Sequence, residues 1–203
     1  MRSALRGGCS ICGRMERSEI RELSYRMVGY RRNLVPGGTF FFTAMLANRE
    51  SRALVENIDL LRYAFRVTRH ERPFSIDGVV VLPDHLHVVI TLPTSDDNFP
   101  ARWKRFKSLF TRLVVERDRA GGRNLRGEYE LWQRRYWEHT IRDESNLARH
   151  IDYIHFNPLK HKLVSRVEEW PHSSFHHYVR QGVLPRDWGG SIALESRFGE
   201  RSG

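Results

Sequence analysis

Two histidines separated by one residue, His85 and His87, are the first side chains in the sequence that could carry out chemistry. They open an apolar run that predicts a β-strand, and side chains two apart on a strand project from the same face. Two imidazoles on one face can hold a single divalent ion between them. A simpler interpretation is also open, in which both rings face solvent and bind no ligand.

A second group with chemical potential lies in the segment 149–158, RHIDYIHFNP. A helix here places Tyr153 and Asn157, four residues apart, one above the other on one face. An amide oxygen is a hard donor that can complete a metal site begun by two imidazoles, and a phenol can act as a nucleophile. Alternatively, Tyr153 is a half-buried core residue and Asn157 is a helix C-cap beside Pro158.

These side chains need a scaffold. Runs rich in β-branched and aromatic residues indicate strands, apolar residues at steps of three and four indicate helices, and Pro73 and Pro158 are expected to end two of the helices. The expected elements are strands at 39–46, 74–82, 85–92 and 136–141, with helices at 51–70, 101–120 and 143–157. Their order, βαββαβα, predicts an α+β ferredoxin-like sandwich, an antiparallel sheet with helices on one face.

The charge of the chain suggests what the site acts on. The formal net charge is +10, from 34 Lys and Arg against 24 Asp and Glu, and 30 of the basic residues are arginine. The excess is concentrated in residues 1–32, with a net charge of +5, and in residues 102–135, with +7. Because the planar guanidinium matches phosphate oxygens in pairs, this distribution favours a nucleic-acid partner over a generic basic surface.

Length and composition exclude several other classes of protein. A chain of 203 residues that is 40% hydrophobic fits one domain with a buried core. No apolar run approaches the roughly 20 residues of a membrane span, and no secretory signal is recognisable. The two cysteines, Cys9 and Cys12, form no disulfide framework and at most half a zinc site. We therefore expect a cytoplasmic protein.

Taken together, the motifs resemble those of a known superfamily. The triplet His85-Leu86-His87, with Tyr153 and Asn157 on a later helix, resembles the single-tyrosine HUH transposases, which are named for their His-hydrophobic-His triplet. Within that superfamily, four stretches are similar to the REP-associated tyrosine transposases: GYRRNLVPGGTFFFTAML, VLPDHLHVVITLP, RRYWEHTIRDESNLARHIDYIHFNPLKHKLV and EWPHSSFHHYV.

The likeness covers about Tyr30 to Tyr178, and the paired cysteines lie outside it. It implies an HUH nuclease-like catalytic domain at 29–180, preceded by a basic N-terminal arm at 1–28 and followed by a C-terminal tail at 181–203.

The resemblance also implies a role for each candidate site residue. His85 and His87 would bind Mg²⁺ or Mn²⁺, Asn157 would supply the third ligand, and Tyr153 would be the nucleophile. Attack of a phenolate on phosphorus, with the metal drawing charge from a non-bridging oxygen, would leave a 5′-phosphotyrosine and a free 3′ hydroxyl. His150, three residues before Tyr153, is a candidate proton acceptor, and a solvated residue or DNA contact at that position is equally consistent.

One nucleophile and one metal process one strand at a time, so the expected substrate is single-stranded DNA or a hairpin with a single-stranded flank. The resemblance implies hairpins of the REP type, and the activity it implies is DNA nicking and strand joining. We expect no small-molecule substrate, no membrane contact, and a monomer or weak dimer.

The predicted DNA contacts come from two parts of the sequence. One is the basic face of the helix at 101–120, for which a solvated face is the alternative. The other is the aromatic and basic stretch that includes Tyr136 and Trp137, where core aromatics are the alternative. The predicted DNA-binding residues are Arg102, Lys104, Arg105, Lys107, Arg112, Trp132, Arg134 and Arg135.

Two other functions remain open from the sequence. The protein could be a domesticated one that binds repeat hairpins without cutting them. An RNA-binding ferredoxin-like module is less favoured, because the aromatic RNP pattern is missing. The nuclease hypothesis requires the Tyr153 phenol to lie within reach of a cation held by His85 and His87. A ring packed inward, or one far from the imidazoles, would contradict it.

Overall fold

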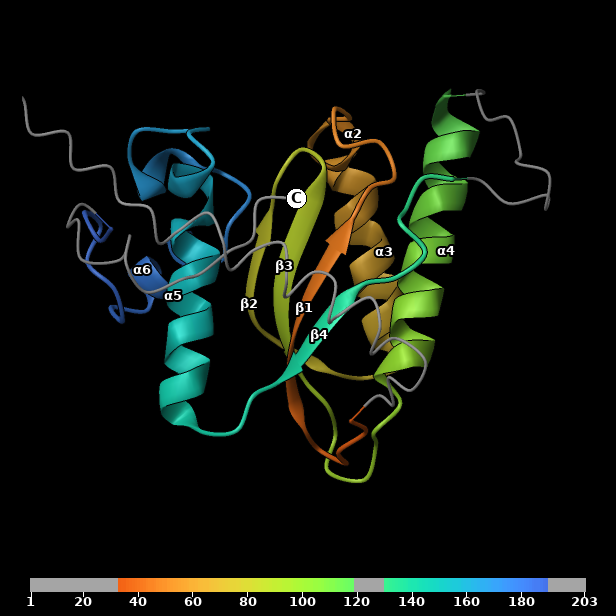
Figure 1. The fold of residues 1–203 in the computed structure, drawn as a ribbon, viewed down its shortest axis with the longest axis horizontal. Coiled ribbons are helices and arrows are strands. Elements are labelled where there is room, and N and C mark those ends of the chain that lie inside the picture. The colour runs from red at the N-terminus through yellow and green to blue at the C-terminus, as the bar shows by residue number, and fades with distance from the viewer. Residues whose placement is uncertain (1–32, 119–129, 190–203) are drawn as a thin grey trace, which may run out of the picture. The chain divides into compact units, whose positions relative to one another are not determined.

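The computed structural model describes residues 33–118 and 130–189. Cys9, Cys12 and the predicted arm at 1–28 lie outside this part of the chain. The described residues form a four-stranded antiparallel sheet in the order β2-β3-β1-β4 (Figure 1), which confirms the predicted ferredoxin-like sandwich. The strands are β1 (Thr39–Met45), β2 (Ser75–Val81), β3 (His85–Thr91) and β4 (Trp137–Thr140). The helices are α2 (Ala53–Glu56), α3 (Ile58–Glu71), α4 (Phe99–Asp118), α5 (Glu144–Lys160), the 3₁₀ helix η2 (Val167–Glu169) and α6 (Phe175–Arg180).

Helices lie on both faces of the sheet. The two crossover helices, α3 and α4, cover one face as predicted, but α5 covers the opposite face (Figure 1). The helices therefore do not all lie on one face as predicted, because α5 packs against β2 and β3 on the face that α3 and α4 leave uncovered. The alternation of side chains along β1 shows the division. The rings of Phe40 and Phe42 lie 4.7 and 5.3 Å from that of Phe99 at the start of α4, whereas the ring of Phe41 lies 5.9 Å from that of Tyr153 on α5.

The main hydrophobic core lies between the sheet and the α3 and α4 pair. Trp103, Phe106 and Phe110 of α4 are all buried there, on the apolar face that the sequence predicted. Aromatic side chains bury large areas, so this face contributes much of the stability of the fold. None of the helices in the described segments combines the length and apolar character needed to cross a bilayer.

The helix predicted at 51–70 is divided in two at Asn57, which separates α2 from α3. The Asn57 side chain stabilises the break, because its Nδ2 donates to the Ala53 carbonyl at 3.0 Å and its Oδ1 accepts from Arg117 at 3.2 Å. Leu54 and Leu61, on either side of the break, are both buried in the main core. The predicted apolar face is therefore retained although the helix is interrupted.

Helix α5 ends later than predicted, and the expected stop before Pro158 is wrong. Pro158 lies inside α5, which runs to Lys160. Proline costs roughly 3 kcal/mol in a helix interior, but here it lies in the last turn and removes one backbone hydrogen bond. The helix ends where Lys162 adopts a φ of 57°, with Lys162 N donating to Leu159 O at 2.9 Å and Leu163 N donating to Pro158 O at 3.0 Å. This Schellman motif usually has glycine at the left-handed position, so no stop signal is visible in the sequence.

The segment after α5 closes one edge of the sheet and holds α5 in place. Residues 172–174 run along β2, with Ser174 N donating to Val79 O at 2.8 Å. The Ser174 hydroxyl is hydrogen-bonded to Nε2 of His155 on α5 at 2.9 Å. The ring of Trp188, within the predicted tail, lies 6.0 Å from the same imidazole. Helix α5 is therefore held between the sheet and the C-terminal segment.

Candidate functional site

His85 and His87 lie at the start of β3 and point to the side of the sheet that α5 covers. The register of the sheet places them opposite Met45 and Thr43 of β1. Their ring centroids are 5.0 Å apart, and the two residues are 5% and 2% exposed. The imidazoles share one face as predicted, and their burial contradicts the alternative of a solvent-facing pair.

Both imidazoles are oriented through Nδ1. His87 Nδ1 lies 2.8 Å from the Thr43 hydroxyl, and His85 Nδ1 lies 2.7 Å from Asp84, whose other oxygen pairs with Arg49 at 2.8 Å. Burial acts to raise the pKa of Asp84, but the hydrogen bond to His85 and nearby positive charge outweigh it, so the pKa of this carboxyl is lowered. In the tautomer in which Nδ1 donates to these oxygens, each ring keeps its Nε2 lone pair, an arrangement typical of metal-binding histidines.

The buried polar atoms that lack hydrogen-bond partners among the described residues include His87 Nε2 and, one helical turn beyond Tyr153 on α5, Asn157 Oδ1 and Asn157 Nδ2. Asn157 is fully buried. Burying such an atom without a hydrogen-bond partner costs about 1–3 kcal/mol, so a bound ligand that pairs with these atoms would stabilise the site. Burial and the neighbouring positive groups hold the pKa of His87 well below its ordinary value, so the ring is neutral and its lone pair is available. An imidazole nitrogen and an amide oxygen fit a divalent cation.

The kinds of side chain near the imidazoles limit which residues could coordinate that cation. Within residues 33–118 and 130–189, no group of three or more His, Cys, Asp or Glu side chains could hold a metal ion. A third protein ligand from this part of the chain must therefore be of another type. Asn157 is such a residue, and its position inside α5 excludes the alternative of a helix C-cap.

Tyr153 lies beside the imidazoles but is largely covered. Its ring is 5.1 Å from that of His87, edge to face, and Lys160 Nζ lies 5.4 Å from its centroid. The residue is 8% exposed. The proximity meets the requirement of the nuclease hypothesis, whereas the burial of the ring is one of the two findings that were expected to contradict it.

A third histidine near the site, His161, was not identified as a candidate from the sequence. Its ring lies 5.0 Å from that of His85. Both residues line a cavity of about 270 Å³ that also includes Arg49 and Arg52. His161 follows Tyr153 by two helical steps of four, so it would have been found had the helix been extended through Pro158.

His150, the candidate proton acceptor, lies near the phenol but is a weak base. Its Nδ1 is 2.7 Å from the carbonyl of Asn146, which leaves Nε2 to take a proton. Burial lowers the pKa of His150 more than the hydrogen bond to Asn146 raises it. Its ring and that of Tyr153 both contact Phe41, at 4.8 and 5.9 Å.

Two of the predicted DNA-binding residues are buried, which corrects that part of the prediction. Arg102 is 3% exposed, and its guanidinium binds both Asp96 oxygens, at 3.1 and 2.7 Å. Trp132 is 8% exposed and packs between Phe106 and Phe110. An arginine that anchors a loop and a tryptophan that fills the core are not available to DNA.

Two more of these side chains, Arg105 and Lys107, are held by short hydrogen bonds. Arg105 makes two hydrogen bonds to Glu71, both 2.6 Å long. Lys107 donates to the carbonyl of Gln133 at 2.7 Å and lies over the Trp132 ring, and burial lowers its pKa to about 8. The hydrogen bonds of Arg105 and of Lys107 would have to break, or be shared with the phosphate, for these side chains to bind DNA.

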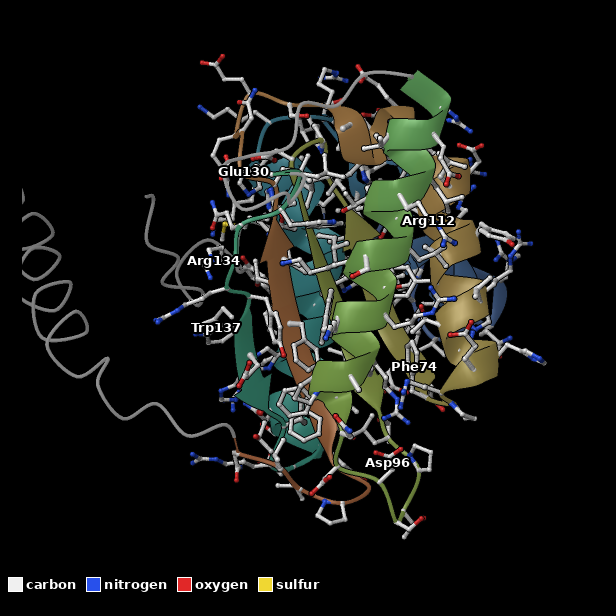
Figure 2. The ribbon with its side chains drawn as sticks, turned by 90° about the vertical axis from the view of Figure 1, so that its right-hand side faces the viewer. Phe74, Asp96, Arg112, Glu130, Arg134 and Trp137 are labelled. Atoms are coloured by element: carbon white, nitrogen blue, oxygen red, sulfur yellow. The ribbon has the colours of Figure 1, made fainter. Side chains whose placement is uncertain are left out.

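The remaining four predicted contacts, Lys104, Arg112, Arg134 and Arg135, are exposed. Lys104 and Arg112 lie on α4, on the face of the sheet opposite the imidazoles. Arg134 lies just before β4, at the edge of the sheet (Figure 2). Trp137, which the sequence placed in the same aromatic and basic stretch, is 54% exposed at this edge. The predicted DNA-binding surface therefore has fewer available residues on α4, and at β4 Trp137 rather than Trp132 is the exposed tryptophan.

Comparison with known proteins identifies the family. No family model matches the chain. The chain is 41% identical over 175 residues to the REP-associated tyrosine transposase of Escherichia coli K12, covering 86% of this chain and 98% of that protein. A Haemophilus influenzae protein named for the same family is 42% identical over 171 residues, which cover 83% of this chain and 97% of that one. A solved structure of a REP-associated tyrosine transposase bound to a REP hairpin is 40% identical, with a TM-score of 0.74, over 86% of this chain and 98% of its own. Matches of this identity over nearly the whole length of the relatives show that the chain belongs to the REP-associated tyrosine transposases.

Proposed function

We propose that this protein nicks and rejoins single-stranded DNA at REP-type hairpins, as a metal-dependent single-tyrosine HUH enzyme with a 5′-phosphotyrosine intermediate on Tyr153. The observation that carries the proposal is that two buried polar atoms, His87 Nε2 beside the Tyr153 ring and Asn157 Oδ1 one helical turn beyond Tyr153 on α5, have no hydrogen-bond partner among the described residues. The relative that was solved with a REP hairpin supports the substrate.

The proposed cofactor is Mg²⁺ or Mn²⁺, held by His85, His87 and Asn157. When bound, it would draw negative charge from a non-bridging phosphate oxygen at the reacting centre. The mixed nitrogen and oxygen donor set is compatible with both ions, and the two imidazoles favour Mn²⁺ in vitro.

The covalent step is carried by Tyr153. Its phenol loses a proton, its oxygen bonds to phosphorus, and the bond from phosphorus to the 3′ oxygen breaks, after which that oxygen takes up a proton. The ammonium group of Lys160, beside the phenol ring, favours the phenolate and offsets the charge of the phosphate. The reverse reaction, with the 3′ hydroxyl of another strand, joins DNA.

The test uses the full-length protein, a labelled REP-type hairpin with a single-stranded flank, and Mn²⁺. We expect a protein–DNA complex that survives denaturation, and we expect Tyr153→Phe to abolish it while still binding the hairpin. A stable adduct formed by Tyr153→Phe would contradict the assignment of the nucleophile.

A second candidate function is a non-cleaving protein that binds repeat hairpins. The covering of the Tyr153 ring favours it, because the phenol is poorly accessible as it stands. Tight, salt-sensitive hairpin binding by the wild-type protein, with no adduct in either Mg²⁺ or Mn²⁺, would establish this function in place of the first.

A further inference from the structure

Trp137 is the one exposed tryptophan of the chain, all five of which lie in the described residues. It begins β4, the edge strand that pairs only with β1 in the sheet, and it lies along the same edge as Arg134 (Figure 2). Its partner in the register is Thr43, whose hydroxyl contacts His87. The indole therefore lies on the face of the sheet that carries the candidate active site.

A continuous row of rings connects this indole to the site. Trp137 stacks on His139, with centroids 5.9 Å apart and planes 10° apart, and His139 stacks on His150 of α5 at 4.9 Å. Trp137 also contacts Phe41 edge to face at 5.6 Å, and Phe41 contacts Tyr153 at 5.9 Å. Two ring-to-ring steps therefore separate the exposed indole from the phenol, a span of about three nucleotides at the roughly 3.4 Å rise of a stacked strand.

The charge around the indole is suited to a nucleic acid. Arg134 and Arg135 precede it and are both exposed, and Arg149 on α5 lies close enough to His150 to act on it electrostatically. The acidic residue of β4, Glu138, pairs in register with Phe42 and so lies on the opposite face of the sheet. An exposed aromatic ring flanked by arginines is the combination that binds unpaired bases, whose faces stack while the cations contact the backbone.

We propose that Trp137 is a stacking platform for an unpaired DNA base within about three nucleotides of the scissile phosphate. The distance to that phosphate rests on the proposed function, whereas the stacking does not. In this account the single strand enters the active site along the β4 edge, over Trp137, and the stacked base sets which phosphate reaches Tyr153.

The experiment measures DNA affinity in the absence of divalent metal, so that cleavage does not interfere. The full-length protein is titrated with a REP-type hairpin carrying a single-stranded flank and with the same hairpin lacking it. We expect Trp137→Ala to weaken binding of the flanked hairpin about tenfold, within the range that alanine substitution of stacking aromatics produces, and to leave the other hairpin unaffected. Trp137→Phe should retain most of the affinity.

The matched control is Tyr63→Ala on α3, since Tyr63 is an exposed aromatic at 46% with Arg66 over its ring. It should bind both hairpins like the wild type. A 2-aminopurine scan of the flank locates the stacked base: one position should be quenched in the wild type and recover its fluorescence in Trp137→Ala.

Three results would overturn the proposal: unchanged affinity of Trp137→Ala for the flanked hairpin, an equal loss on both hairpins, or an effect of Trp137→Ala on self-association alone, which would make the indole a contact between copies of this chain. Flank-dependent binding through Trp137 without any adduct in Mn²⁺ would uphold the platform and overturn only the proposed cleavage.

Discussion

The two faces of the sheet bury different kinds of unpaired polar atom. On the α4 face, the atoms without partners among the described residues include Trp103 Nε1, Trp132 Nε1 and Arg102 Nε. These are donors only and cannot bind a cation. On the α5 face, His87 Nε2 and Asn157 Oδ1 carry lone pairs. Although Asn157 Nδ2 on the same face is also a donor, the lone pairs on the α5 face support the ligand site proposed there, and the α4 face has only the chemistry of a core.

This division also explains how one four-stranded sheet can carry a hydrophobic core on one face and a candidate ligand site on the other. The aromatic residues of β1 that face α4, such as Phe40 and Phe42, are fully buried among other rings. Across the strand, Phe41 and Thr43 contact the imidazole of His87. Substitutions on the α4 face should therefore change stability, and substitutions on the α5 face should change metal binding and cleavage.

The largest expected effect is that of His87→Ala. Removing a proposed metal ligand should lower the rate of adduct formation in Mn²⁺ by about 10³-fold or more, because a bound metal would supply several kcal/mol at the reacting centre. Circular dichroism should show an intact fold. Thr43→Val is a milder partner variant that removes only the bond to Nδ1, and it should weaken Mn²⁺ binding about 10- to 100-fold. A His87→Ala protein that forms the adduct at the wild-type rate would remove the distinction between the two faces.

On the opposite face, Phe42→Ala should act on stability alone. Phe42 is fully buried against Phe99 and Trp103, so truncation should lower the free energy of unfolding by about 3–5 kcal/mol, measured by urea denaturation. The fraction that remains folded should bind Mn²⁺ with wild-type affinity. A selective loss of Mn²⁺ affinity in the folded protein would show that the two faces are not independent.

Acid should destabilise the α5 face through His155. Burial, with a smaller contribution from His176, lowers the pKa of His155 from 6.5 to about 4. The unfolded chain therefore binds more protons than the folded one between these values, and stability falls as pH is lowered through this window, by about 3 kcal/mol at most from this group. We expect His155→Gln, compared with wild type by urea denaturation from pH 7 to 4, to lose less stability. Equal losses in the two proteins would exclude His155 as the source.

The smallest predicted effect is a gain in stability at the end of α5. Lys162 is an exposed residue at a φ of 57°, so Lys162→Gly should relieve strain and raise the free energy of unfolding by about 0.5–1 kcal/mol. Lys162→Ala retains a Cβ at the same positive φ, so it keeps the strain and should show no such gain. Thermal denaturation of the two variants separates these outcomes, and an equal change in both would point to the lost lysine charge instead.

The sequence was sufficient to predict the sheet, and spacings of two on a strand and four on a helix were sufficient to put His85 on the same face as His87 and Tyr153 on the same face as Asn157. That the two pairs form one site was implied only by the family resemblance. The sequence was insufficient to predict which side chains are buried by tertiary packing. Trp132 and Trp137 lie in the same aromatic and basic stretch, yet one fills the core and the other is exposed.

Two features of the site depended on longer-range structure. Thr43 meets His87 only through the pairing of β1 with β3, which the sequence of neither strand reveals. His161 was not identified from the sequence, because a proline in the last turn of a helix cannot be distinguished there from a proline that ends one.

The most direct test of the account is a crystal structure of the protein soaked in Mn²⁺ and measured at the manganese absorption edge. The account predicts one anomalous peak bonded to Nε2 of His85, Nε2 of His87 and Oδ1 of Asn157, next to the Tyr153 ring. No peak at the two imidazoles in a fully soaked crystal, or a peak coordinated without Asn157, would contradict it.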